Sequence, residues 1–585
     1  MLEDFTAATA GLRAAPVLSP TGPLISVLIL TLDGRELLDR LFRSFEAVNE
    51  YQAVEFIVVD HGSLDGTLEC LRQWALRLPV KIIARGANFS FSESNNKAAR
   101  LASGELLMLL NNDVVFVRDC LGEMVAALRH TGAGAVGLKQ YQGLPESFEP
   151  RRIYHLGVRF GWNIVERRLR PHHVRPSAID AKLMDGLAAF PAVTASALLC
   201  RRDDYLAVGG LCEQYVYGLE DVDFCCKLRF TLGKEVVSYN GSFAFHPKNA
   251  TRNRDPSTRR PLEKRNRKVL QERWGYRVRR DFISSRFDDD GSRTGRPFTV
   301  GLAVPPDAVP GHAGLAKALL NLGEGLRRTF GWKTVYLGAD DSTDASDLDL
   351  YVSTEPGFDV RGLTGAEPHL LIACYVLDQG QAWLRRKPLD AFDLRFCGDA
   401  GLQAQLLEQC GQCCRVDPQA PAPAVHDEIA RALGAFRVAL KIGSRRGELS
   451  RARALRRALV ELGQVARIDG AEDWYAPPSL ADDAAVVMDS SYRPAVDQIN
   501  VLIRAASKKS EPGLGAWDGV IAPRRLTDIN DPGPSPSPNG GGEIDGLAAA
   551  VLAVIKAAHS RRTIGPDDEA LVDPQCVSAA EGKSP

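Results

Sequence analysis

Three groups of polar side chains follow short apolar runs near the amino-terminal end of the chain. They are Thr31-Leu-Asp33 after the run Ile25–Leu30, Asp60-His-Gly-Ser63 after Val54–Val59, and Asn111-Asn-Asp113 after Glu105–Leu110. Short apolar runs between turn residues are typical of buried parallel strands. The carboxyl ends of parallel strands meet at one edge of a sheet, where ligands bind. We therefore expect these polar groups to share one binding site.

Each of these acids also has a purely structural interpretation. Asp60 could cap the helix that follows it, and Asp113 could end its strand through turn chemistry. The amphipathic segments between the apolar runs give a strand–helix alternation, which favours a doubly wound α/β sheet. It is the order of the three groups, more than any one acid, that indicates a site.

Two further motifs carry groups that could do chemistry. Gly218-Leu-Glu-Asp-Val-Asp-Phe224 places Glu220 beside Asp221, and Phe243-Ala-Phe-His246 ends in a histidine. A positioned carboxylate can take the proton of an attacking hydroxyl. The same acids would also satisfy free N–H groups and the dipole at the amino terminus of a helix. Both roles can hold at once, whereas Asp223 could project elsewhere.

In this order the motifs resemble the family 2 glycosyltransferases, which have the GT-A fold, over about residues 24–280. The matching segments are Ile25–Asp33, Glu55–Thr67, Asn88-Phe-Ser-Phe with Asn95-Asn96, Gly104–Val114, Gly218–Phe224 and Phe243–His246. The chain departs from the family pattern at three positions. His61 stands where Asp or Asn is more usual, Asn111 where the first Asp of the metal motif often stands, and Cys212 precedes Glu213 where an acidic pair is usual.

The resemblance implies an inverting transfer of a sugar from a nucleotide-diphosphate sugar to a hydroxyl of a glycan or glycolipid. Asp221 would be the catalytic base and Glu220 its supporting neighbour. Asp113 and His246 would hold a divalent metal, Mg²⁺ or Mn²⁺, which neutralises the diphosphate leaving group. The implied contacts to the donor nucleotide are Thr31, Asp33, Asp60, Ser63, Asn88, Asn95, Asn111 and Asn112.

Composition limits the other classes of function. The 585 residues exceed what one core usually organises, so we expect two or three domains. Lys and Arg number 72 against 73 Asp and Glu, and this balance offers no global field for nucleic acid. The twelve cysteines are scattered, and we interpret them as reduced thiols. The basic stretch 248–280 is either a solvated loop and helix or, through Lys248, Arg252 and Arg254, a loop that closes over the diphosphate.

The fold class we expect is α/β, a GT-A nucleotide-diphospho-sugar transferase domain followed by one or two Rossmann-like α/β domains. The predicted order is an irregular lead-in at 1–23, the GT-A domain at 24–285, a linker at 286–297, a Rossmann-like domain at 298–425, a second such unit at 434–560 with a flexible linker at 531–542, and a disordered tail at 561–585. The second half weakly resembles the halves of GT-B glycosyltransferases. It lacks a glycine-rich phosphate loop of good pattern, which favours an inactive or acceptor-binding appendage.

The amino terminus has no export signal and no apolar run is long enough to span a bilayer, so we expect a cytoplasmic protein. A lipid-linked acceptor would bring it to the inner face of the membrane, as in the assembly of a bacterial surface polysaccharide. Three alternatives stay open: a non-catalytic glycan- or nucleotide-binding scaffold, a bifunctional transferase with a second active site, and a nucleotidyltransferase. Donor sugar, linkage and oligomeric state are not predicted.

Overall fold

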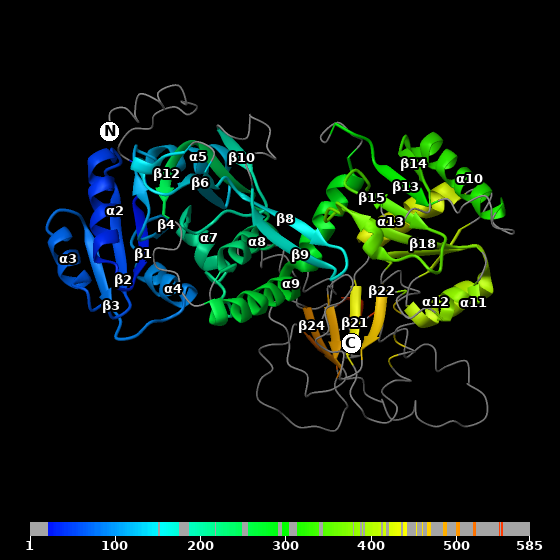
Figure 1. Ribbon diagram of the computed structural model, residues 1–585. Helices are drawn as coiled ribbons and strands as arrows, with labels where there is room; N and C mark the ends of the chain where they lie inside the picture. Colours follow the sequence, from blue (N-terminus) through cyan, green and yellow to red (C-terminus); the bar gives the residue numbers. More distant parts are fainter. Residues whose placement is uncertain are drawn as a thin grey trace, which may run out of the picture. The chain divides into compact units, whose positions relative to one another are not determined.

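The computed structural model describes residues 22–434 with internal gaps and, beyond them, mainly the strands of one further sheet (Figure 1). The gaps are 150–151, 175–185, 217, 248–255, 290–294, 304–312, 339–342, 378–379, 386–388, 390–391, 411–412 and 417–420. The chain divides into two compact units. Unit 1 holds residues up to 160 and 170–270, and unit 2 holds 161–169 and most of the chain from 271 onward.

Unit 1 is built on a mixed sheet to which ten of the described strands belong. Its order is β10 (Leu187–Ala189), β12 (Val236–His246), β6 (Ala135–Gln142), β11 (Ala197–Arg201), β4 (Leu106–Asn111), β1 (Ile25–Thr31), β2 (Val54–Asp60) and β3 (Val80–Ala84), with β5 (Val115–Phe116) beside β12 and β7 (Ile153–His155) beside β6. Strands β3, β2, β1 and β4 run parallel, as the apolar runs predict. Strand β11 is antiparallel to both of its neighbours.

Helices pack on both faces of this sheet. They are α2 (Arg35–Val48), α3 (Thr67–Trp74), α4 (Phe91–Leu101), α5 (Leu121–Thr131), α7 (Arg202–Ala207) and α8 (Glu220–Leu232). Helix α2 forms because Leu38, Leu41, Phe42 and Phe45 recur at helical spacing, and all four are buried. Burying each such side chain contributes roughly 1.5–3 kcal/mol. This apolar stripe attaches α2 to the sheet.

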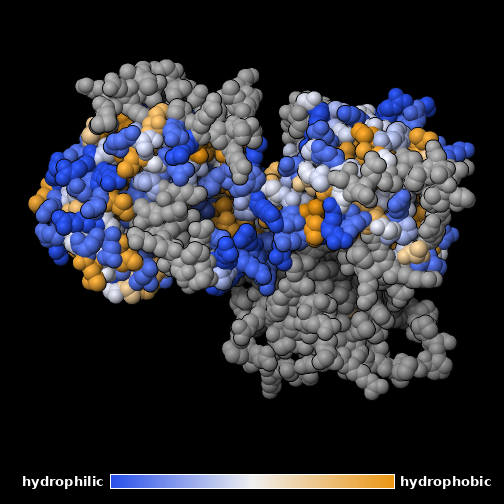
Figure 2. Space-filling view, viewed as in Figure 1, coloured by the Kyte–Doolittle hydropathy of each residue, from blue (hydrophilic) through white to orange (hydrophobic). Residues whose placement is uncertain are grey.

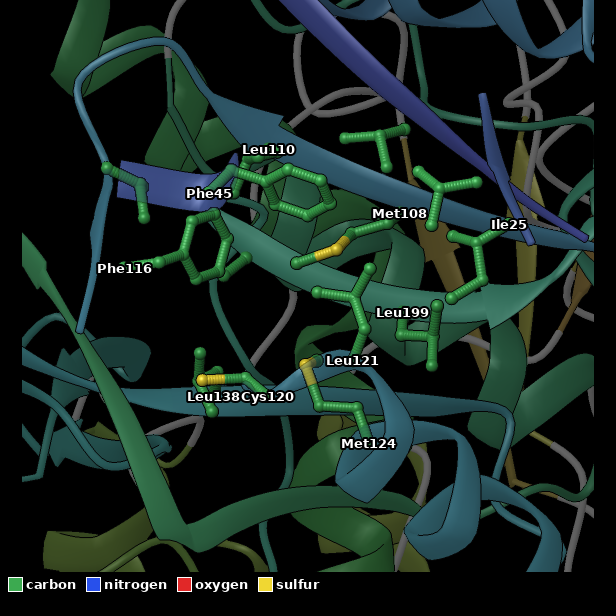
Figure 3. Close-up of a cluster of buried hydrophobic side chains, with 14 of the residues drawn as sticks. Ile25, Phe45, Met108, Leu110, Phe116, Cys120, Leu121, Met124, Leu138 and Leu199 are labelled. Atoms are coloured by element: carbon green, nitrogen blue, oxygen red, sulfur yellow. The ribbon is translucent and has the colours of Figure 1, made fainter. Parts of the chain in front are cut away.

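The core of unit 1 joins α2 and α5 to one face of the sheet (Figure 3). The Phe45 ring lies edge-on to Phe56 with centroids 5.0 Å apart. From α5, Leu121 and Met124 reach toward Met108 on β4. The core therefore packs against one face of strands β1, β2 and β4 and leaves their carboxyl ends available for a site.

Unit 2 contains two parallel sheets. The first has the order β14 (Lys333–Leu337), β13 (Thr299–Ala303), β16 (Leu350–Ser353), β18 (Leu371–Val376), β19 (Leu394–Cys397) and β20 (Cys414–Arg415). Its described helices are α10 (Ala313–Phe330), α11 (Gly380–Arg385), α12 (Ala400–Cys410) and α13 (Pro421–Gly434), and β15 (Thr343–Asp344) pairs with β17 (Leu363–Thr364). The second sheet has the order β22 (Val465–Asp469), β21 (Arg437–Lys441), β23 (Ala484–Val487), β24 (Ile499–Ile503) and β25 (Gly519–Ile521).

These parallel sheets agree with the α/β class predicted for the second half, whereas its resemblance to GT-B halves stays a prediction. The predicted lead-in, the flexible linker at 531–542 and the tail lie outside the described residues. Among the helices that the structure describes, none is both long and apolar enough to cross a membrane.

Helix α9 (Pro256–Phe287) extends beyond residue 280, where the basic stretch that the sequence indicates as a loop and helix ends. Between residues 260 and 268 the helix exposes basic side chains, and Figure 2 shows hydrophilic residues gathered over this part of the helix. Its last turns continue because Arg279 and Arg286, two turns apart, bind buried carboxylates. Arg286 pairs with Asp349 at 2.8 Å and Arg279 with Asp393 at 2.8 Å. The helix thus runs into the linker predicted at 286–297, and the domain boundaries stay a prediction.

A two-stranded hairpin also departs from the predicted alternation. Strands β8 (Val158–Asn163) and β9 (Arg168–His173) form a two-stranded sheet, and Val158 at the start of β8 also bridges to Ala192. Residues 161–169 at its tip belong to unit 2, where Arg167 pairs with Asp393. The sequence predicts no helix or strand here, because its charged and apolar residues follow no regular period.

Candidate active site

The register of the sheet brings the three predicted polar groups to one edge. Thr31 at the end of β1 lies opposite Asp60 at the end of β2. On the other side of β1, Leu30 lies opposite Asn111 at the end of β4. The Asn112 amide donates to Thr31 Oγ1 at 3.0 Å, which ties the first and third groups together.

The loops after β1 and β2 brace each other through Asp33 and Ser63. The Asp33 N–H donates to Ser63 Oγ at 2.8 Å, and Asp33 Oδ1 accepts the Leu64 N–H at 2.7 Å. Asp33 has a φ of 47°, a left-handed conformation that aspartate adopts more readily than most residues. Two predicted donor-binding residues are therefore in direct contact.

Asp60 keeps one oxygen free for a ligand. Its Oδ2 accepts the N–H groups of Gly62 and Ser63, both at 3.1 Å. Its Oδ1 is buried and has no hydrogen-bond partner. A buried acceptor without a donor is costly, so this atom suits the N–H of a nucleotide base. Asp60 does not cap helix α3, because Gly62 and Ser63 precede that helix and its N-cap is Gly66.

His61 organises the next predicted residue, Asn88. Its Nδ1 lies 2.9 Å from Asn88 Oδ1 and its Nε2 lies 2.8 Å from Ser94 Oγ. Arg85 donates to the same Ser94 oxygen at 3.0 Å, so the serine proton points toward His61. Burial lowers the pKa of His61, which keeps the ring neutral with its proton on Nδ1. The Asn88 carbonyl is fixed in this way, and its amide group is turned away from the ring.

The predicted residue Asn95 lies apart from these groups. Its amide donates to the Phe91 carbonyl one turn earlier in α4, at 3.0 Å. The neighbouring Asn96 accepts the Tyr205 hydroxyl at 2.7 Å and the Leu211 N–H at 2.8 Å. Both asparagines are buried and serve the packing of α4. A donor contact by Asn95 stays a prediction.

Asn111, Asp113 and His246 converge at a corner between β4 and β12. Strand β5 follows Asp113 and pairs with β12, with Val115 opposite Phe245. This pairing sets Asp113 Oδ1 3.0 Å from His246 Nε2. The Asn111 amide lies 3.2 Å from the same nitrogen. The site therefore contains the two predicted metal ligands side by side, with an amide as a third polar group.

The donor chemistry of this corner fits a divalent cation. Asp113 Oδ1 is buried without a hydrogen-bond partner, and so is His246 Nδ1. With the Asn111 amide as donor, His246 Nε2 has a lone pair, so two lone pairs face each other at 3.0 Å. Adjacent ligands of an octahedral ion with bonds of about 2.1 Å are about 3.0 Å apart. Among the described residues, no group of three or more His, Cys, Asp and Glu side chains is placed for a metal, so an amide or water must complete any set here.

Glu220 and Asp221 begin helix α8, as the acid-rich amino terminus predicts. Asp221 Oδ1 accepts the Val222 N–H at 2.8 Å, and its Oδ2 accepts the Ala195 N–H at 3.1 Å. Its carboxylate is half-buried, whereas Glu220 is buried. Asp223 points into the protein, where Tyr215 donates to it at 3.2 Å. Asp221 is therefore the acid of this run that remains open to an acceptor.

The residue before α8 has a strained backbone. Leu219 has a φ of 74°, in the left-handed region that leucine rarely adopts. Asn266 of α9 donates to the Gly218 carbonyl at 2.9 Å and helps to hold this turn. Backbone strain of this kind costs about 1–3 kcal/mol and gathers at functional sites.

A short turn at Val193–Ser196 links the metal corner to Asp221, and it lies in the segment 191–200 that resembles the acceptor-side segment of family 2 glycosyltransferases. Ala195 donates to Asp221, while the carbonyl of the next residue, Ser196, accepts the Asn111 N–H at 3.1 Å. Gly137 lets the turn approach β6, because a Cβ there would lie 2.7 Å from Val193 Cβ. The backbone groups of the turn, not its side chains, make these two contacts. Lys248, Arg252 and Arg254 of the expected diphosphate loop lie outside the described residues.

Part of this chain is similar to known proteins. Residues 26–185 match the model of the family described as Glycosyl transferase family 2. An uncharacterized protein, y4gI, of Sinorhizobium fredii is 31% identical over 293 residues, which are 47% of this chain and 31% of that protein. The O-antigen biosynthesis protein RfbC of Myxococcus xanthus is 28% identical over 40% of this chain and 18% of its own length. The chain thus spans a third or less of these two relatives.

A crystal structure of GalNAc-T7 with UDP, GalNAc and Mn²⁺ overlaps 46% of this chain and 53% of its own at 15% identity, with a TM-score of 0.34. That overlap is too low to bear on function. The mixed sheet with its polar carboxyl edge is the GT-A fold of nucleotide-diphospho-sugar transferases. Residues 26–185 match the glycosyltransferase family 2 model, and these residues include the first and second strands and the Asn111–Asp113 motif.

Proposed function

We propose that the chain is an inverting glycosyltransferase that moves a sugar from a nucleotide-diphosphate sugar to a hydroxyl of a glycan or glycolipid. The proposal rests on one arrangement. The metal corner of Asp113 and His246 and the half-buried Asp221 are joined through the adjacent residues Ala195 and Ser196. A site for the leaving diphosphate and a base for the acceptor thus share one rigid support.

In the proposed reaction, Asp60 accepts an N–H of the nucleotide base and the loops of Asp33 and Ser63 bind the nucleoside. A bound Mg²⁺ or Mn²⁺ would neutralise the diphosphate. Asp221 takes the proton of the acceptor hydroxyl, and the oxygen of that hydroxyl attacks the anomeric carbon. The bond from that carbon to the diphosphate breaks, and its electron pair leaves with the nucleoside diphosphate. One direct displacement inverts the anomeric configuration.

The name of the Myxococcus relative supports a role in bacterial surface polysaccharide assembly, and a lipid-linked acceptor would bring the enzyme to the inner face of the membrane. We propose that the second unit is not catalytic and binds the acceptor. The competing scaffold hypothesis is favoured by Asn111, which removes one carboxylate from the metal corner.

The test is sugar transfer by the full chain from a panel of nucleotide sugars, with and without Mn²⁺. Asp221→Asn keeps the size of the side chain and removes the base, so we expect transfer to fall about 10²–10⁴-fold. Asp203→Asn, at an exposed acid of α7, is the matched control and should retain full activity. Full activity of Asp221→Asn would exclude the assigned base. Nucleotide binding without any transfer would favour the scaffold.

A further inference from the structure

A buried histidine, His155, lies behind the turn that holds Asp221. It ends β7, which pairs with β6 so that His155 lies opposite Gln140. Its side chain is 0% exposed and therefore touches neither donor nor acceptor. A buried imidazole needs polar partners, and those partners reveal what it does.

The partners of His155 fix its protonation. The Thr194 N–H donates to His155 Nε2 at 3.3 Å, so this nitrogen carries no proton. The proton of the neutral ring lies on Nδ1, which faces His173 Nδ1 at 3.0 Å. Burial holds the pKa of His155 well below its ordinary value, and nearby His173 and His246 act in the same direction. The ring therefore remains a hydrogen-bond acceptor for the turn throughout the neutral range.

The turn passes this contact on to the site through consecutive residues. Thr194 is bound by His155, Ala195 donates to Asp221 Oδ2 at 3.1 Å, and the Ser196 carbonyl accepts the Asn111 N–H. The Ser196 hydroxyl also donates to Gln140 Oε1 at 2.9 Å. Rotation of the Thr194 peptide would turn the neighbouring Ala195 N–H away from Asp221. The direction of that N–H thus depends on an acceptor behind Thr194.

We propose that His155 is a positioning residue for the base. Its imidazole holds the Thr194–Ala195 turn so that the Ala195 N–H keeps the Asp221 carboxylate directed at the acceptor hydroxyl. This inference rests on the role proposed for Asp221. An apolar side chain of similar size would fill the same space, but it would leave the Thr194 N–H buried without an acceptor.

Two substitutions in the full chain distinguish the role of His155 as a hydrogen-bond acceptor from its role in packing. His155→Met fills the space without an acceptor, and we expect kcat to fall about tenfold while the donor KM stays within twofold, because only the base is misdirected. In His155→Gln the amide oxygen replaces Nε2 as acceptor, so kcat should recover to within about threefold of the parent chain. The thermal midpoint of each variant reports on the fold.

A double variant decides whether the effect passes through Asp221. In an Asp221→Asn background, adding His155→Met should cost no further activity, because residues that act as one unit are not additive. An equal tenfold loss in that background would overturn the proposal. So would a parallel fall of kcat, donor affinity and thermal midpoint in both His155 variants. If Asp221→Asn itself is fully active, the proposed function fails first and His155 has no base to position.

Discussion

Asn111 places a neutral amide in the metal corner, where a carboxylate would add a negative charge. Its amide faces His246 Nε2, and Asp113 supplies the nearest carboxylate oxygen. Hard divalent ions prefer carboxylate oxygens to amides, because the negative charge offsets the cost of losing water. From one carboxylate, one imidazole and one amide we therefore expect a modest metal affinity.

Restoring the missing carboxylate should therefore tighten metal binding. In Asn111→Asp we expect the Mn²⁺ concentration for half-maximal transfer to fall about tenfold, which corresponds to one improved charged ligand of about 1.4 kcal/mol. The measurement is a metal titration at saturating donor. Asn112→Asp is the comparison, since the Asn112 amide donates to Thr31 and its loss should weaken donor binding without tightening the metal. An unchanged metal requirement in Asn111→Asp would place the ion elsewhere.

Asp119 shows how burial alone changes the pH dependence of stability. Burial, with Glu50 nearby, raises the pKa of this carboxyl to about 6. Because the folded pKa lies above the unfolded one, the stabilisation is present at pH 4 and is lost as the pH rises through 6. Asp119→Asn should therefore gain about 1 kcal/mol over the parent chain between pH 4 and pH 7, a figure reduced for solvent screening. Urea unfolding at both pH values measures the difference, and a constant difference would contradict the expected titration.

At the scale of whole elements, buried ion pairs attach helix α9 to the first sheet of unit 2. Arg279 lies against Asp393 just before β19, and Arg286 lies against Asp349 just before β16. Burial alone would raise the pKa of Asp393, but Arg167 and Arg279 hold it far below its usual range. Both carboxylates precede their strands, at the edge opposite to the one where parallel sheets bind ligands. This cluster therefore serves the fold of unit 2.

Removing one buried charge from this cluster should be costly. Asp393→Asn leaves Arg279 without its counter-charge, and we expect unit 2 to lose about 3–5 kcal/mol of unfolding free energy. Denaturant unfolding followed by tryptophan fluorescence measures it. Asp427→Asn, at an exposed acid of α13, should change the stability by less than about 0.5 kcal/mol. A loss equal to that of the control would mean that the arginines find other partners.

The elements of the first half were largely predictable. The apolar runs Ile25–Leu30, Val54–Val59 and Glu105–Leu110 are observed as strands β1, β2 and β4, whose limits differ from those runs by one residue at most. Buried parallel strands are continuous apolar runs, which stand out in any sequence. The antiparallel direction of β11 was not predictable, since an apolar run carries no sign of its direction. The length of α9 depends on Asp349, 63 residues after Arg286, and on Asp393, 114 residues after Arg279.

The candidate site was predictable where its residues carry charge. Motif residues such as Asp60, Asp113 and Asp221 stand out by type and position. The turn that joins them contributes backbone groups, and His155 reaches it from a strand with no acidic pattern. Contacts of this kind depend on three-dimensional packing, which one sequence does not display.

At the scale of the whole molecule, two compact units have separate hydrophobic cores. The core of unit 1 surrounds Phe42 and Phe56, whereas that of unit 2 includes Val300 and Trp332. Units with their own cores can unfold in separate steps. The proposed donor site then belongs to the unfolding transition of unit 1, and the buried charges of α9 belong to that of unit 2.

Calorimetry of the full chain should resolve these transitions. A nucleoside diphosphate with Mn²⁺, at about 100 times its Kd, should stabilise the transition of unit 1 by about 2.7 kcal/mol and leave the other in place. Asp393→Asn should lower the transition that the ligand does not move. A single transition displaced by both treatments would mean that the two units unfold together.

The left-handed Leu219 has a consequence for directed evolution. Glycine adopts this conformation without strain, so Leu219→Gly should raise the free energy of unfolding by about 1 kcal/mol and with it the thermal midpoint. The same change loosens the residue just before Glu220 and Asp221. A library screened for survival at high temperature should therefore enrich glycine at this position, whereas one screened for turnover should keep leucine.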